Sequence, residues 1–217
     1  MSFCLFRVRP RLPASLLTFI HYPPAADCQH YITTSWWDAW TAPGVGGKDG
    51  FINFNQVVFG NAKISPAGVI TCQHGPQECD LNIMQDCAIA LSTGPEQWLP
   101  FIHCLEGYGV QQKAHVSKCA TAVKLSLTSL NTCWQGEQGK ALVLAAAKAT
   151  PSDHQYVPWT TVNGVNACDE TGCDGVLAAA CKAYVAGGGT APAACPAAGA
   201  EPKRALRRAG SSSKADW

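Results

Sequence analysis

The chain has 217 residues, of which 16 are basic and 15 acidic, so its formal net charge at pH 7 is +1. This length suits one domain, or one domain carrying an insertion, that can bury a sizeable core. The near balance of charge argues against the basic surface that nucleic-acid binding requires. No apolar run reaches the roughly 18 to 20 residues that a membrane-spanning helix needs. We therefore expect neither a nucleic-acid partner nor a transmembrane segment.

Cysteine is the most informative residue type, with twelve in the chain. Zinc sites usually bring repeated C-x-x-C pairs, and no two cysteines here have that spacing. Such a density instead predicts disulfides in an oxidising compartment. A protein of that kind needs a targeting signal, but Pro10 and Pro13 interrupt the N-terminal segment, so no signal-peptide core is visible in this chain.

The chain opens with the pattern of a strand, a helix and a second strand. Residues 16–22 form a short apolar run that two prolines end, and residues 25–40 place apolar and aromatic side chains at helical spacing. Residues 51–59 read as the second strand, which the Gly60-Asn61 pair closes.

A helical segment and then a return to strands follow. Helical spacing recurs in 79–91, 97–106, 114–134 and 140–149. Four successive helices do not continue a strand–helix alternation, which predicts a helical insertion at about 76–150. Residues 156–164 again have strand composition with an Asn-Gly turn, and 175–185 predict a last helix. This order is the layout of an α/β thioredoxin-like fold with an inserted helical subdomain.

Residues 72–87 read C-Q-H-G-P-Q-E-C-D-L-N-I-M-Q-D-C. The segment resembles the signature of the gamma-interferon-inducible lysosomal thiol reductase (GILT) family, C-Q-H-G-x-x-E-C-x-x-N-x-x-x-x-C. The matching positions are Cys72, Gln73, His74, Gly75, Glu78, Cys79, Asn82 and Cys87. The same segment allows a zinc site through its three cysteines and His74, although the spacing is not a standard one. We favour disulfide-bonded, metal-free cysteines that tie the insertion to the sheet.

Two further segments carry the resemblance, which spans residues 16–197. Phe59-Gly60-Asn61-Ala62 is similar to a family strand that ends in G-N-A, and residues 156–164 are similar to the family's Y-V-P-W-x-T-V-N-G. The resemblance implies that Pro158 follows a cis peptide bond, which is uncommon. It also implies that Val157 and Tyr22 help to bind an extended substrate beside the redox site.

The chain departs from the family at the redox motif itself. Family members carry C-x-x-C after the first strand, where the first thiolate attacks a substrate disulfide and the second cysteine resolves the mixed disulfide. Here Cys28 falls at the resolving position and Ala25 stands where the nucleophile belongs. The resemblance therefore implies a thiol–disulfide oxidoreductase scaffold with impaired or absent activity, acting without a cofactor.

Three hypotheses remain open for this site. In the first, the native protein is an active thiol reductase in which Ala25 is an engineered replacement. In the second, Ala25 is natural and the domain is a redox-inactive relative that binds peptides beside Pro158. In the third, the chain is a redox-inactive structural subunit of a larger protein assembly. The expected partners are accordingly disulfide-bearing proteins or peptides, or a larger complex, in the endolysosomal lumen or outside the cell.

The predicted organisation is an N-terminal extension over 1–15, a GILT-like thioredoxin-fold domain over 16–197, and a disordered basic tail over 198–217. Outside the signature, the expected disulfide cysteines are Cys104, Cys119, Cys133, Cys168, Cys173, Cys181 and Cys195. Among them Cys168 and Cys173 are close enough to close a local loop, and Cys181 and Cys195 form a reasonable pair. The remaining pairings cannot be chosen from the sequence.

Overall fold

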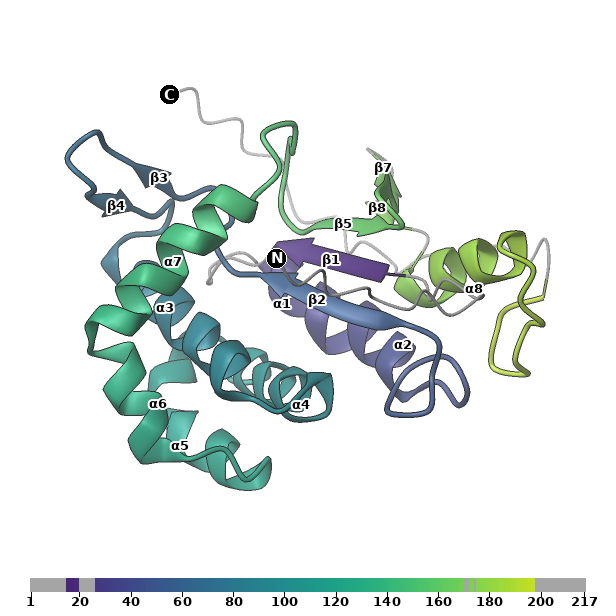
Figure 1. Cartoon of the computed structure of the whole chain (residues 1–217), viewed down its shortest axis with the longest axis horizontal. Helices are drawn as coiled ribbons and strands as arrows, with labels where there is room; N and C mark the ends of the chain where they lie inside the picture. Colours follow the sequence, from purple (N-terminus) through teal and green to yellow (C-terminus); the bar gives the residue numbers. More distant parts are fainter. Residues whose placement is uncertain (1–14, 20–25, 170–171, 174, 198–217) are drawn as a thin grey trace, which may run out of the picture.

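The computed structural model describes residues 15–19, 26–169, 172–173 and 175–197 (Figure 1). The positions of Tyr22 and Ala25, almost all of the predicted N-terminal extension and the whole predicted tail lie outside the described residues. Within the described ranges, no helix is both long and apolar enough to cross a bilayer.

A four-stranded mixed sheet forms the centre of the protein. It contains β1 (Ser15–Phe19), β2 (Asn53–Val57), β5 (Trp159–Val162) and β6 (Val165–Asn166), in the order β2-β1-β5-β6. Strand β1 runs parallel to β2 and antiparallel to β5, and β5 turns into β6 through Asn163-Gly164, both with positive φ. The predicted strands at 51–59 and 156–164 thus contribute to one sheet.

A continuous helical run from Ala26 to Thr41 lies between β1 and β2 in the sequence. It consists of α1 (Ala26–Tyr31), a π-helical turn (Ile32–Trp36) and α2 (Trp37–Thr41). Thr33 and Thr34 both donate side-chain hydrogen bonds to main-chain oxygens one turn back. Such bonds compete with the regular helix ladder and accompany the local widening. The fully buried Trp36 packs its ring edge against Phe54 of β2, with centroids 5.4 Å apart.

The last helix, α8 (Val176–Ala186), packs against the π-helical turn, α2 and β5. Its first N–H has no partner within the helix, and the hydroxyl oxygen of Ser35 accepts it at 3.0 Å. A disulfide between Cys181 and Cys195 fixes the segment that follows the helix.

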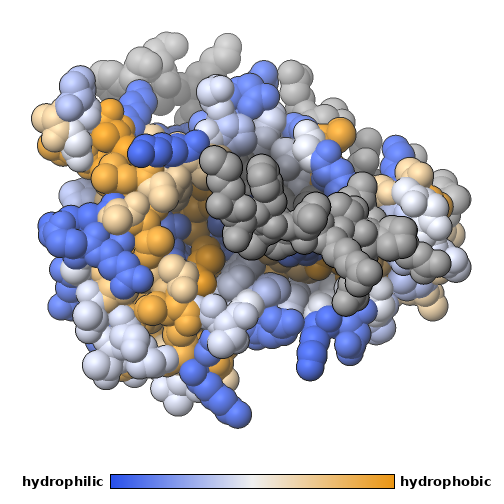
Figure 2. All heavy atoms as spheres, viewed as in Figure 1, coloured by the Kyte–Doolittle hydropathy of each residue, from blue (hydrophilic) through white to orange (hydrophobic). Residues whose placement is uncertain are grey.

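Five α-helices and a short 3-10 turn lie together at one side of the sheet (Figure 1). They are α3 (Pro76–Leu91), α4 (Pro95–Glu106), the 3-10 turn Gly109–Gln111, α5 (Gln112–Ala122), α6 (Leu127–Trp134) and α7 (Glu137–Ala149). Helix α3 packs on α7, α6 and α4 and so forms the centre of this group. Figure 2 shows apolar surface in the region of α7, where Leu144 is exposed.

The prediction of a single helix over 114–134 was wrong, because the chain breaks between α5 and α6. Lys124 adopts a left-handed φ of 57°, and the N–H groups of Lys124 and Leu125 bond back to Thr121 and Ala120. This is the Schellman ending of a helix, which usually places glycine at the left-handed residue. Ser126 then caps α6 by accepting the N–H of Ser129.

Two short hairpins were not predicted from the sequence. They pair β3 (Lys63–Ile64) with β4 (Ile70–Thr71), and β7 (Cys168–Asp169) with β8 (Gly172–Cys173). Each strand has only two residues, which is too short for a period-two pattern to appear. The side chains of Cys168 and Cys173 lie outside the described residues.

A buried carboxyl group links three helices of the helical group. Glu106 at the end of α4 accepts hydrogen bonds from the side-chain amides of Gln85 on α3 (3.1 Å) and Gln112 on α5 (2.9 Å). The amide of Gln29 on α1 donates to the main-chain oxygen of Glu106 and so joins this cluster to the helix beside the sheet. Burial raises the pKa of Glu106 from 4.5 to about 7, although the two amides oppose the rise.

Because the pKa of Glu106 is raised, we expect its contribution to the free energy of unfolding to be greater in acid. Folded protein keeps the Glu106 proton up to about pH 7, whereas an unfolded chain loses it near the ordinary value. Rising pH therefore favours the unfolded state across this window. At about 1.4 kcal/mol per pKa unit, Glu106 alone should lower the free energy of unfolding by roughly 3 kcal/mol as the pH rises through this window. Urea titrations at a series of pH values measure the change.

The substitution Glu106→Gln should remove this group's contribution to the slope and leave the contributions of the other buried acids, because the amide has the size of the protonated acid without its titration. Glu137→Gln provides the control, since that side chain lies on the surface of α7, where it pairs only with Lys140. Parallel pH curves for the wild type and Glu106→Gln would contradict the assignment.

Candidate functional site

Pro158, one of the predicted site residues, lies at one edge of the sheet. In the strand register, Phe19 at the end of β1 lies beside Val57 at the end of β2 and opposite Trp159 at the start of β5. The cis peptide bond between Val157 and Pro158 immediately precedes this start. Because Phe19 is the last residue of β1 and lies opposite Trp159, Pro158 lies at the edge of the sheet where β1 ends.

Cys28 lies near the start of α1 and is 0% exposed within the main core. Tyr31, one turn further along, fixes this helix to the sheet through side-chain hydrogen bonds with Thr160 of β5 and Ser35. Burial raises the pKa of Tyr31 to about 12, so its hydroxyl stays protonated and available to donate. The position of Cys28 relative to β5 is therefore set by buried contacts.

The signature residues build the start of α3. Gly75 adopts a φ of 95°, which favours glycine, and Pro76 occupies the first helical position, where its missing N–H costs nothing. Glu78 accepts the main-chain N–H of His74 at 2.7 Å and contacts its ring Nδ1 at 3.1 Å. The Cys72–Cys79 disulfide closes the same turn. These residues together stabilise one helix start.

Two buried acids on the same helix have raised pKa values. Burial raises the pKa of Glu78, while the hydrogen bond and charge of His74 oppose the rise. Burial also raises the pKa of Asp86 to about 8, although the Val58 main-chain N–H donates to its carboxyl group. This last contact ties α3 to the end of β2, and the next residue, Cys87, forms a disulfide with Cys133 of α6.

The signature cysteines are all paired. Cys72, Cys79 and Cys87 are in disulfides, a state in which a sulfur is not a zinc thiolate. Cys104 of α4 pairs with Cys119 of α5. Signature Asn82 is buried on α3. Three of the four described disulfides therefore stabilise the helical group or its junction, and the signature itself has a structural role.

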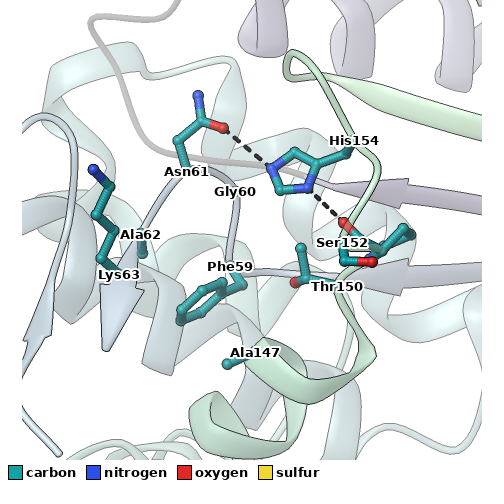
Figure 3. Close-up of a pocket in the computed structure, with 10 residues that line it drawn as sticks. Phe59, Gly60, Asn61, Ala62, Lys63, Ala147, Thr150, Ser152 and His154 are labelled. Atoms are coloured by element: carbon teal, nitrogen blue, oxygen red, sulfur yellow. Dashed lines mark hydrogen bonds between the residues drawn. The ribbon is translucent and has the colours of Figure 1, made fainter. Parts of the chain in front are cut away.

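Three polar side chains form a row of hydrogen bonds just after the end of β2. This row was not predicted from the sequence. The side chain of Asn61 lies between Gln73, to which its amide donates at 2.9 Å, and the Nε2 of His154 at 3.3 Å. Figure 3 shows Asn61 and His154 directed toward one another over a pocket that includes Phe59 and Ala147. Asn61 and Gln73 belong to the two predicted motifs, whereas a single histidine between prolines gives no periodic signal.

Comparison with known proteins supports the resemblance. Residues 19–123 match the family model for gamma interferon inducible lysosomal thiol reductase. The chain is 33% identical over 141 residues to a gamma-interferon-responsive lysosomal thiol protein of Arabidopsis thaliana, covering 63% of this chain and 58% of that protein. It is 31% identical over 153 residues to the Carassius auratus gamma-interferon-inducible lysosomal thiol reductase, covering 66% and 59% respectively. The match thus spans less than two thirds of either relative.

The helix start predicts a specific cost for changing the signature glycine. Gly75→Ala meets no neighbouring atom, but it places a side chain on a backbone with φ 95°. We expect the free energy of unfolding to fall by about 1–2 kcal/mol, as measured by urea titration. Gly187→Ala is the matched control, because its φ is −80° and its new Cβ makes ordinary contacts. Equal effects of the two substitutions would contradict this role for Gly75.

Proposed function

The chain belongs to the gamma interferon inducible lysosomal thiol reductase family, and from this we propose that it carries a thiol–disulfide oxidoreductase scaffold whose activity is impaired by Ala25. One observation carries the proposal. Cys28 lies in the first turn of the helix that follows β1, the residue three positions earlier is alanine, and Pro158 immediately precedes β5, whose first residue pairs with the last of β1.

The arrangement of elements supports a thioredoxin-like fold with an inserted helical subdomain at about 76–150. Strand β1, the helical run from α1 and the parallel strand β2 form a β-α-β unit, and β5, β6 and α8 complete the sheet and one of its faces. The helices α3 to α7 lie between β4 and β5 in the chain and pack mainly on each other. We infer that the insertion is a separate unit, in which the signature disulfides close the start of α3 (Cys72–Cys79) and join α3 to α6 (Cys87–Cys133).

The chemistry of such a site needs two thiols with different tasks. The first attacks as a thiolate, forming a new S–S bond to the substrate and releasing the other substrate sulfur. The second attacks this mixed disulfide, and the reduced substrate leaves as the enzyme's own disulfide forms. Cys28 has the second position and is fully buried, so it is poorly placed to begin the reaction. We infer that the missing first thiol, rather than the fold, limits activity.

An oxidising compartment, either the endolysosomal lumen or the outside of the cell, is the proposed location. Four disulfides within the described residues support it, because reducing compartments rarely sustain them. The proposed substrates are proteins or peptides with disulfides.

A redox-inactive role is the second candidate, favoured by the same alanine. In that case the edge beside Pro158 binds peptides without reacting, or the chain serves as a structural subunit of a larger assembly. Both alternatives require only the scaffold and its buried contacts.

Replacing the missing thiol tests the proposal directly. Wild-type protein should not turn over a model disulfide peptide, whereas Ala25→Cys restores the spacing of C-x-x-C with Cys28 and should give catalytic turnover. The rate should be greatest where the new thiol is ionised but still a good nucleophile. Turnover is followed by the release of peptide thiol under excess reductant.

Ala25→Ser is the matched control, since it adds a similar side chain without a thiolate and should stay inactive. Adding Cys28→Ser to Ala25→Cys should abolish turnover and leave peptide covalently attached, as seen by mass spectrometry. An Ala25→Cys protein that folds normally but remains inert would favour the structural-subunit alternative.

A further inference from the structure

Two adjoining surface pockets lie where β2 ends and the hairpin β3–β4 begins. The first has a volume of about 480 Å³ and includes Phe59, Asn61, Lys63, Thr150 and His154 among its lining residues. The second includes Thr71, Cys72 and Gln73. Asn61 and Lys63 line both pockets, so their side chains form the ridge between them.

The charge of the lining is one-sided. Lys63 and His154 supply an ammonium group and an imidazole, and Asn61, Gln73, Thr71, Thr150 and Ser152 supply amides and hydroxyls. Within the part of the chain that the structure describes, no aspartate or glutamate lines either pocket. A site of this composition attracts negative charge and offers neutral donors to bind it.

The polar side chains are already held in place by one another. His154 directs Nδ1 to the main-chain oxygen of Pro151 at 2.6 Å and Nε2 to the side-chain oxygen of Asn61 at 3.3 Å. Asn61 in turn donates to Gln73 at 2.9 Å. Both ring nitrogens thus lie within hydrogen-bonding distance of protein oxygens, which fixes the orientation of the ring. A fixed site costs less entropy on binding than one that must assemble.

The first pocket also adjoins the edge where we place the substrate. Its apolar wall, Phe59 and Ala62, belongs to the same buried cluster as Trp159, against which Tyr156 and Val157 pack. His154 is only four residues before Pro158. A peptide lying beside Pro158 therefore passes close to this cationic rim.

We propose that the two pockets form a carboxylate-binding subsite that selects acidic peptides, with Lys63 as the residue that recognises the negative charge. The inference rests on the proposed peptide-binding edge and names the substrate class for it. Asn61 and Gln73 position His154 and supply further donors. The source of the carboxylate is a peptide side chain or terminus.

Binding, rather than turnover, tests this subsite on the full wild-type chain. Two fluorescently labelled peptides of equal length are compared by anisotropy, one with two glutamates and the other with glutamines in their place. The glutamate peptide should bind more tightly, and added salt should weaken it. Lys63→Gln should weaken it about three- to fivefold, in the range of exposed ion pairs, without affecting the glutamine peptide.

Lys182→Gln is the matched control, because it removes the same charge from an exposed position of α8 and should leave binding unchanged. Equal affinity for the two peptides, or binding of neither, overturns the subsite. Tight binding of inorganic phosphate without discrimination between the peptides overturns the peptide assignment in favour of a free anion. If Ala25→Cys turns over peptides without preferring acidic ones, only the acidic-peptide subsite is contradicted. If Ala25→Cys is inert but binds acidic peptides more tightly, only the proposed reductase scaffold is contradicted.

Discussion

The position of β1 between β2 and β5 is the constraint on which the other features depend. Its parallel pairing with β2 requires a crossover, which the helical run from Ala26 to Thr41 supplies. Its antiparallel pairing with β5 brings back a strand that follows the whole helical group. Because Phe19 lies opposite Trp159 and beside Val57, the end of β1, the cis proline and the G-N-A turn all reach the same edge. A shift of one residue in this register would turn every side chain of β5 to the other face.

The helical group is held to the sheet and its crossover helix by polar contacts as well as by apolar packing. Asp86 binds the main chain at the end of β2, and the main-chain oxygen of Glu106 accepts from Gln29, the residue after Cys28. Both carboxyl groups are buried and have raised pKa values, so each is accommodated in the fold mainly as the neutral acid. Acidic conditions therefore suit this interior.

The signature residues at the start of α3 have structural roles that differ from the redox role predicted for positions 25 and 28. Cys72, Gly75, Glu78 and Cys79 close and cap the start of α3. None of these tasks depends on a reactive thiol, so the geometry of this helix start does not require a cysteine at position 25. Gln73 is the exception, because its side chain points to Asn61 and the cationic pockets rather than to the helix start. The structural roles of the signature residues are therefore separate from the residue at position 25.

The sequence by itself determined the order of the main elements, the family resemblance and the departure at Ala25, since these rest on local periodicity and on motifs of fixed spacing. It did not show the end of α5, because Lys124 takes the left-handed position where a glycine would have signalled the break. It also left most disulfide pairings open, because chain spacing does not fix which cysteines meet, whereas packing of α3 on α6 brings Cys87 to Cys133. The contact of Asn61 with His154, 93 residues apart, was likewise decided only by the strand register. Local patterns specify elements, but a site built from several of them exists only once the chain has packed.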